Sequence, residues 1–267
     1  MKILINTTIS RMILGELIGT FVLVFIGTGS VAVAVLFDAL NLYQIAAIWC
    51  LAVVSGIYSS KKLSDAHLNP AVSLGFVITK ELKWSEFMWY ILSQFTGAIL
   101  AGFTIYFIFS NQISEFELTN HIIRGTETSK QSAMMFGEFY PNPGNKNLAE
   151  LSTTIAMLLE GVGTFLLMFV ILNLVHSKKI NGKLVPLLIG LTVAILIVFI
   201  APYTQAGFNP ARDLGPRITS YFMGWKSIVF NLPKMGAILV YVTAPLTGAV
   251  LAALLFKTYH PKKIKLD

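Results

Sequence analysis

Long apolar stretches recur along the whole chain and constrain its fold more than any other feature. A bilayer core of about 30 Å requires about 20 apolar residues per helix. Six segments reach that length: 12–36, 42–60, 86–109, 151–175, 184–201 and 234–257. Only 12% of the residues are charged, whereas a soluble domain carries about 25%. Because so few polar side chains cannot cover a soluble fold, the sequence predicts an all-α membrane protein with six transmembrane helices.

Two further apolar stretches, 69–79 and 209–220, are too short to cross the membrane. A helix rises 1.5 Å per residue, so about 11 residues reach roughly 16 Å, about half of the bilayer core. We therefore expect two half-helices. The segment 110–150 is polar and is predicted to form one long loop.

The distribution of charge indicates topology rather than a nucleic-acid partner. The net charge is +7, but most Lys and Arg residues lie at the N-terminus, in the connections 61–83 and 176–183, and in the tail. The positive-inside rule places such segments in the cytoplasm. We expect a multi-pass protein of the cell membrane with both termini cytoplasmic. Cys50 is the single cysteine, so no intrachain disulfide can form.

Three motifs occur twice, in the same order. Each pair has one member in either half of the chain: 16–21 with 160–165, 68–71 with 208–211, and 96–101 with 247–252. Three spans per half is an odd number, so the second half enters the membrane from the opposite side. We expect a single domain over residues 1–267, with inverted repeats at about 12–109 and 151–257 joined by the outer loop 110–150. Inverted repeats with broken helices point to a solute path.

The most informative motif is an Asn-Pro-Ala triplet that begins each half-helix, Asn69-Pro70-Ala71 and Asn209-Pro210-Ala211. Asn is a favoured N-cap and Pro is favoured at the first helical position. Both helix starts should lie near the bilayer midplane, where two positive dipole ends would repel cations. An amide N–H left free by capping could donate a hydrogen bond to a neutral solute and prevent an oriented water from relaying a proton.

The sequences 67–72 and 208–216 resemble the paired motifs of the aquaporin family. Asp213, Arg217, Tyr140 and Pro245 resemble positions that separate glycerol facilitators from water-selective channels. The resemblance implies six helices with two half-helices, a homotetramer with one pore per subunit, and passive passage of small neutral polyols.

The resemblance also implies an aromatic and arginine constriction beside the triplets, at Trp49, Ile197, Ala206 and Arg212. Trp49 and Arg212 fit the glycerol pattern, since an aromatic face suits a carbon backbone and a guanidinium donates to hydroxyls. Ile197 and Ala206 depart from it, because glycerol facilitators carry Gly and Phe there. The pair is more similar to the filter of plant nodulin-type channels. We expect the pore to admit glycerol, water and other solutes such as urea, dihydroxyacetone or protonated lactic acid.

Four ionisable residues in or beside the spans have alternative interpretations. Glu16 and Glu160 could carry protons in a coupled transporter or brace the half-helix loops, and the repeat favours bracing. His67 is interpreted as a loop brace or pore-lining residue rather than a metal ligand, because no partner has ligand spacing. Asp213 either pairs with a nearby basic group at the outer mouth or is a first-turn acid favoured by the helix dipole.

Three other functions are weighed against a glycerol channel. An enzyme is not expected, because no nucleophile–base set, metal cluster, phosphate loop or cofactor motif occurs in the sequence. An ion-coupled secondary transporter also uses inverted repeats and broken helices, but needs a titratable coupling site. A mainly water-conducting aquaporin is disfavoured by Asp213, Tyr140 and Pro245. The bulky Ile197 favours it, so this alternative is retained.

Overall fold

The computed structural model describes residues 7–260, apart from the side chains of Thr7, Thr8 and Lys234. Lys2, Lys262, Lys263 and Lys265, which contribute to the predicted topology, lie outside the described residues. Within these described residues, six helices are long and apolar enough to cross a membrane, as predicted. They are α1 (Thr7–Phe37), α2 (Leu42–Ser60), α4 (Trp84–Thr119), α6 (Thr153–Val175), α7 (Val185–Thr204) and a last span in which α9 (Gly236–Ile238) continues through a π-helical turn (Leu239–Thr243) into α10 (Ala244–Tyr259).

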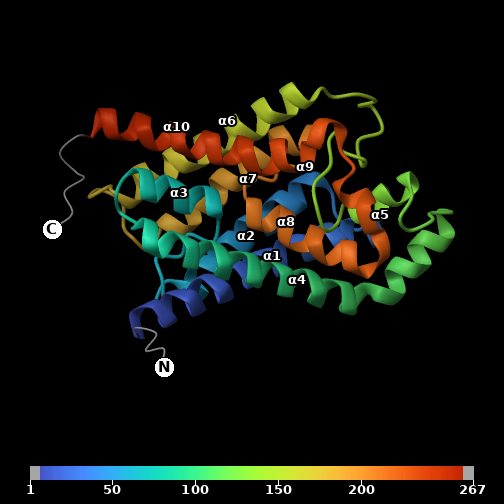
Figure 1. Cartoon of the computed structure of the whole chain (residues 1–267), viewed down its shortest axis with the longest axis horizontal. Coiled ribbons are helices and arrows are strands. Elements are labelled where there is room, and N and C mark those ends of the chain that lie inside the picture. Colours follow the sequence, from blue (N-terminus) through green and yellow to red (C-terminus); the bar gives the residue numbers. More distant parts are fainter. Residues whose placement is uncertain (1–6, 261–267) are drawn as a thin grey trace.

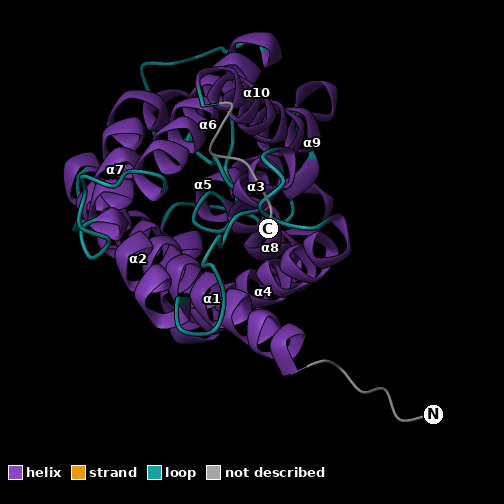
Figure 2. Ribbon diagram, turned by 90° about the vertical axis from the view of Figure 1, so that its left-hand side faces the viewer, coloured by secondary structure: helices purple, strands orange, loops and turns teal. Residues whose placement is uncertain are grey.

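The two predicted half-helices are α3 (Pro70–Ile78) and α8 (Pro210–Ser220), with 9 and 11 residues. The long helices surround these two short ones (Figure 2). The start of α1 and the end of α10 lie at one end of the molecule, and the short α5 (Lys130–Ala133) lies at the other (Figure 1). The remaining elements are a π-helical turn and three 3-10 turns, at Tyr221–Trp225, Glu127–Ser129, Lys226–Phe230 and Pro233–Met235.

The halves of the chain pack through equivalent helices. In the first half α1 packs against α2 and α4, and in the second half α6 packs against α7 and α10. Each half-helix also crosses to the other half: α3 packs against α10, and α8 packs against α4. Each half-helix is therefore held in part by the last span of the opposite half.

The polar segment 110–150 is not one long loop. Helix α4 extends beyond the predicted end at residue 109 to Thr119, and its 36 residues measure about 54 Å, well beyond a bilayer core. The extension is held by Glu117, whose carboxylate accepts bonds from the Arg124 Nε and Nη2 atoms at 2.9 and 2.7 Å and from the Ser132 hydroxyl at 2.7 Å. The polar sequence of this segment predicted a loop, but these contacts with residues that follow in the chain support a helix as far as Thr119.

Small residues let the spans approach closely at two equivalent places. A side chain at Gly97 in α4 would overlap the Leu17 carbonyl of α1, and one at Gly248 in α10 would overlap the Gly161 carbonyl of α6. Both glycines belong to the repeated motif at 96–101 and 247–252. Close backbone contact of this kind is typical of helix pairs in membranes.

We expect Gly97→Val to force α1 and α4 apart and to destabilise the fold by roughly 1–3 kcal/mol, the usual cost of overpacking. Thermal unfolding of the purified protein in detergent would measure the change. Gly182→Val is the matched control, because a side chain at this exposed position would meet nothing within 4 Å. Equal unfolding temperatures for the two variants would contradict the close contact.

Candidate functional site

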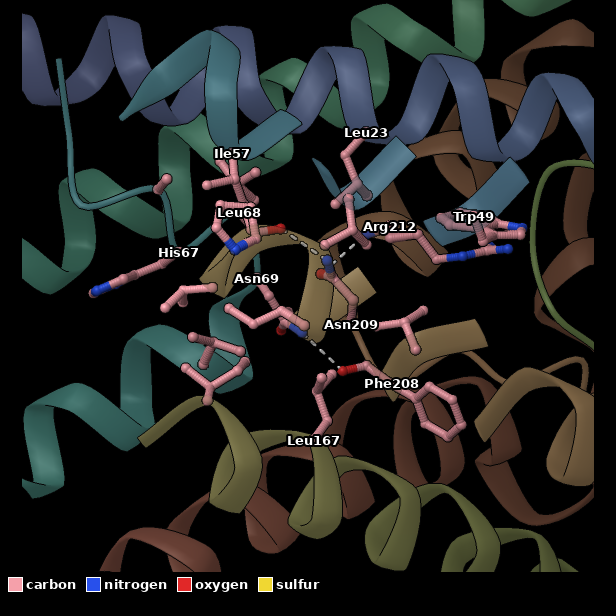
Figure 3. A pocket seen from close by; sticks show the side chains of 18 of the residues that line it. Leu23, Trp49, Ile57, His67, Leu68, Asn69, Leu167, Phe208, Asn209 and Arg212 are labelled. Carbon is pink, nitrogen blue, oxygen red and sulfur yellow. Dashed lines mark hydrogen bonds between the residues drawn. The ribbon is translucent and has the colours of Figure 1, made fainter. Parts of the chain in front are cut away.

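A cavity of about 160 Å³ lies among the helices and passes the starts of both half-helices. It is lined mainly by apolar side chains, together with Asp65, His67, Asn69, Asn209 and Arg212, and Figure 3 labels the last four. All four residues predicted for the constriction line this cavity: Trp49, Ile197, Ala206 and Arg212.

The two triplet asparagines cap their own helices and bond to each other's loops. The Asn69 Oδ1 atom accepts from the Ala71 N–H at 2.8 Å, while its Nδ2 atom donates to the Phe208 carbonyl at 3.0 Å. Asn209 repeats the pattern, accepting from the Ala211 N–H at 3.1 Å and donating to the Leu68 carbonyl at 2.8 Å. Figure 3 shows the two crossed bonds as dashed lines. The half-helices therefore begin beside one another, and each amide keeps a second N–H that these bonds do not use.

Two buried carboxylates hold the loops that precede the half-helices. Glu16 accepts from the backbone N–H groups of His67 and Leu68 at 3.0 and 2.8 Å, from the Ser64 hydroxyl at 2.7 Å and from the Gln94 amide at 2.8 Å. Glu160 accepts from the N–H groups of Gly207 and Phe208 at 3.0 and 2.8 Å and from the Thr204 hydroxyl at 2.6 Å. Non-helical backbone within a membrane must have its polar groups satisfied, and these carboxylates supply the acceptors.

The same loops carry an unusual backbone. Leu68 and Phe208, at equivalent positions, have φ of 54° and 53°, and Ala66 and Ala206 have φ of 57° and 62°. Residues with a side chain rarely adopt this left-handed conformation, at a cost of about 1–3 kcal/mol each. The conformation turns the Leu68 and Phe208 carbonyls toward the asparagine of the opposite half, where they accept the crossed bonds.

Arg212 and Trp49 meet at one part of the cavity. The guanidinium carbon of Arg212 lies 4.3 Å from the centre of the Trp49 ring (Figure 3). Arg212 is 6% exposed and forms an ion pair with Glu138. A cation against an aromatic face is favourable, and the arrangement leaves an apolar surface and hydrogen-bond donors side by side.

Asp213 does not face the cavity. Its carboxylate receives the Arg217 Nε and Nη2 atoms at 3.1 and 2.7 Å and the Glu138 N–H at 2.7 Å. Arg217 also donates to the carbonyls of Glu138 and Val229. The structure therefore shows the pairing with a basic group, Arg217, and it also places Asp213 in the first turn of α8, so the two interpretations of Asp213 hold together.

His67 and Tyr140 occupy different places. The His67 ring lines the cavity, stacks on Phe76 with centroids 4.4 Å apart, and has its Nδ1 atom 3.2 Å from the Ser73 hydroxyl. Tyr140 lies outside the cavity lining, and its hydroxyl donates to the Pro233 carbonyl at 2.7 Å. Burial raises the pKa of the Tyr140 hydroxyl, a group that is already protonated at neutral pH.

Comparison with known proteins identifies the family. A family model described as major intrinsic protein matches residues 4–256. The chain belongs to that family. A glycerol uptake facilitator protein of Pseudomonas aeruginosa is 38% identical over 244 residues, which cover 90% of this chain and 85% of the relative. A propanediol uptake facilitator of Salmonella typhimurium is 32% identical over 253 residues, 93% of either chain.

The crystal structure of the aquaglyceroporin from Plasmodium falciparum is similar to this one, with a TM-score of 0.77 at 29% identity, covering 96% of this chain and 97% of that chain. The predicted aquaporin-like fold is thus confirmed. As a major intrinsic protein the chain is a multi-pass membrane channel and not an enzyme.

Two residues of this major intrinsic protein that contact the site were missed from the sequence. Glu138 contacts Arg212, and the Gln205 side chain accepts from the Phe139 N–H at 2.8 Å and donates to the Met134 carbonyl at 3.0 Å. Gln205 fixes the segment 134–139 beside Ala206. Both contacts join residues distant in sequence, and neither residue belongs to a repeated motif that could have marked it.

We expect Glu160→Gln to weaken the loop of the second half. An amide offers one acceptor oxygen in place of two, so a backbone N–H near α8 would face an NH₂ group, costing roughly 1–3 kcal/mol. The unfolding temperature in detergent should fall relative to Glu150→Gln, a matched change at an exposed residue. A Glu160→Gln protein as stable as this control would show that the carboxylate does not hold the loop.

Proposed function

We propose that this major intrinsic protein is a passive channel for small neutral solutes, chiefly glycerol, and that it also passes water and solutes such as urea. The observation that supports this proposal most is the cavity, which is lined both by the two asparagine amides and by the Arg212–Trp49 contact. Relatives named as glycerol and propanediol uptake facilitators support this solute class.

In this proposal the asparagine pair is the central filter. Helices α3 and α8 both begin there, so their positive dipole ends repel cations. The second N–H of each Asn side chain donates to a passing hydroxyl, or to a water that then cannot relay a proton. No conformational change is needed, because the crossed bonds fix both amides.

Trp49, Ile197, Ala206 and Arg212 form the proposed constriction. Arg212 donates to the solute oxygens while the Trp49 face contacts the solute carbons. Ala206 removes the bulk of an aromatic ring, and the branched Ile197 adds some on the other side, so the opening differs in shape from that of a glycerol facilitator with Gly and Phe.

The two loop carboxylates give no support to ion coupling. Glu16 and Glu160 accept several hydrogen bonds from loop groups and do not line the cavity. We propose that they act as braces, that the halves are inverted repeats, and that the channel is a homotetramer of the cell membrane with cytoplasmic termini. The start of α1 and the end of α10 lie at the same end of the molecule, which agrees with this topology (Figure 1).

Light scattering of proteoliposomes tests the function. Glycerol flux should be proportional to the glycerol gradient and independent of proton and sodium gradients, since a channel has no coupling step. Water and urea gradients in the same vesicles rank the solutes. Flux that follows an ion gradient would indicate a transporter, and water flux without glycerol flux would indicate a mainly water-conducting aquaporin.

Ala206→Phe tests the constriction. A ring at this position should narrow the opening. We expect the permeability to erythritol, a polyol one carbon longer than glycerol, to fall about tenfold relative to the permeability to water, because a solute with one carbon too many for its pocket is disfavoured by about this factor. Ala149→Phe adds the same ring at an exposed loop residue and is the control. If the two variants pass solutes up to the same size, Ala206 is not part of the constriction.

A further inference from the structure

Glu138 is a buried acid beside the proposed constriction that does not line the cavity. It is 1% exposed, and its Oε1 atom pairs with the Nη1 atom of Arg212. We infer that Glu138 is the positioning residue for Arg212: its carboxylate holds the guanidinium against Trp49 and thereby sets the selectivity among neutral solutes. This inference rests on the proposed function.

The bonding of Glu138 differs from that of the other buried acids. Both oxygens of Glu16 and of Glu160 accept hydrogen bonds from the loops that they hold. The Oε2 atom of Glu138 is buried and has no hydrogen-bond partner among the described residues. The side chain of Glu138 therefore holds no loop; its contact with Arg212 is the interaction that accounts for a buried charge here.

The backbone of Glu138 is fixed to the same helix that carries Arg212. Its N–H donates to the Asp213 carboxylate at 2.7 Å, and its carbonyl accepts from Arg217. Asp213 and Arg217 lie on α8, as does Arg212. The carboxylate of Glu138 thus has a defined place relative to Arg212, which is the requirement for positioning a long, flexible side chain.

The contact also balances the buried charge. Arg212 and Arg217 are cations, Glu138 and Asp213 are anions, and all four are buried. A buried charge without a partner is costly, so an Arg212 deprived of Glu138 would turn toward another acceptor or toward water in the cavity. Its donors would then no longer lie beside the Trp49 face where a polyol needs them.

The ratio of glycerol to urea permeability in one proteoliposome preparation tests the inference, because this ratio does not depend on how much protein is folded. Glycerol needs donors and the aromatic face together, whereas planar urea needs them less. We expect Glu138→Ala to lower the ratio about tenfold, the effect of a lost charged hydrogen bond. Glu138→Gln keeps an acceptor oxygen in place and should restore part of the ratio.

Glu117→Ala is the matched control, since it removes a buried acid paired with Arg124 outside the cavity lining. It should leave the ratio unchanged even where it lowers the yield. An unchanged ratio in Glu138→Ala, or a Glu138→Gln ratio as low as that of Glu138→Ala, would overturn the inference. Wild-type vesicles without glycerol flux would instead reject the proposed function, and the urea to water ratio would then test Glu138 in the same variants.

Discussion

The structure depends on two buried carboxylates that satisfy non-helical backbone in the interior of a membrane protein. A chain that breaks its helices there must supply acceptors for the freed N–H groups. Glu16 and Glu160 do so at equivalent positions, each from the first helix of its half and each toward the two residues that precede a triplet asparagine. These acceptors stabilise the loops from which the half-helices begin.

The hydrogen bonds of these carboxylates permit the crossed bonds between the asparagines and the loops of the opposite halves. Leu68 and Phe208 adopt a left-handed backbone at a cost that the neighbouring hydrogen bonds offset. Their carbonyls then accept from Asn209 and Asn69. A carboxylate in one half thus positions the carbonyl that accepts a hydrogen bond from the asparagine of the other half. The packing of α3 on α10 and of α8 on α4 also joins one half to the other.

Sequence patterns predicted those parts of the structure that depend on local chemistry or on repetition. Apolar length identified six spans, and the Asn-Pro pairs predicted the starts of α3 and α8 to the residue. The extension of α4 to Thr119 was missed because its stability comes from Arg124 and Ser132, which follow in the chain. Glu138 was missed for a similar reason: its significance arises when a loop places it against Arg212.

Two parts of the cavity are therefore built on different principles. At the asparagines, repetition supplies both partners of each bond, so symmetry alone specifies the geometry. At Arg212 the partners are unlike residues, Trp49 from α2 and Glu138 from the segment before α6. The first half has no equivalent of this contact because Val72 stands where the second half has Arg212. Trp49 and Glu138 lie outside the crossed loops, so these two residues can vary without disturbing them, whereas Ala206 belongs to the loop that Glu160 holds. In the proposed channel, the part of the selectivity that depends on Trp49 and Glu138 is thus separable from the integrity of the fold.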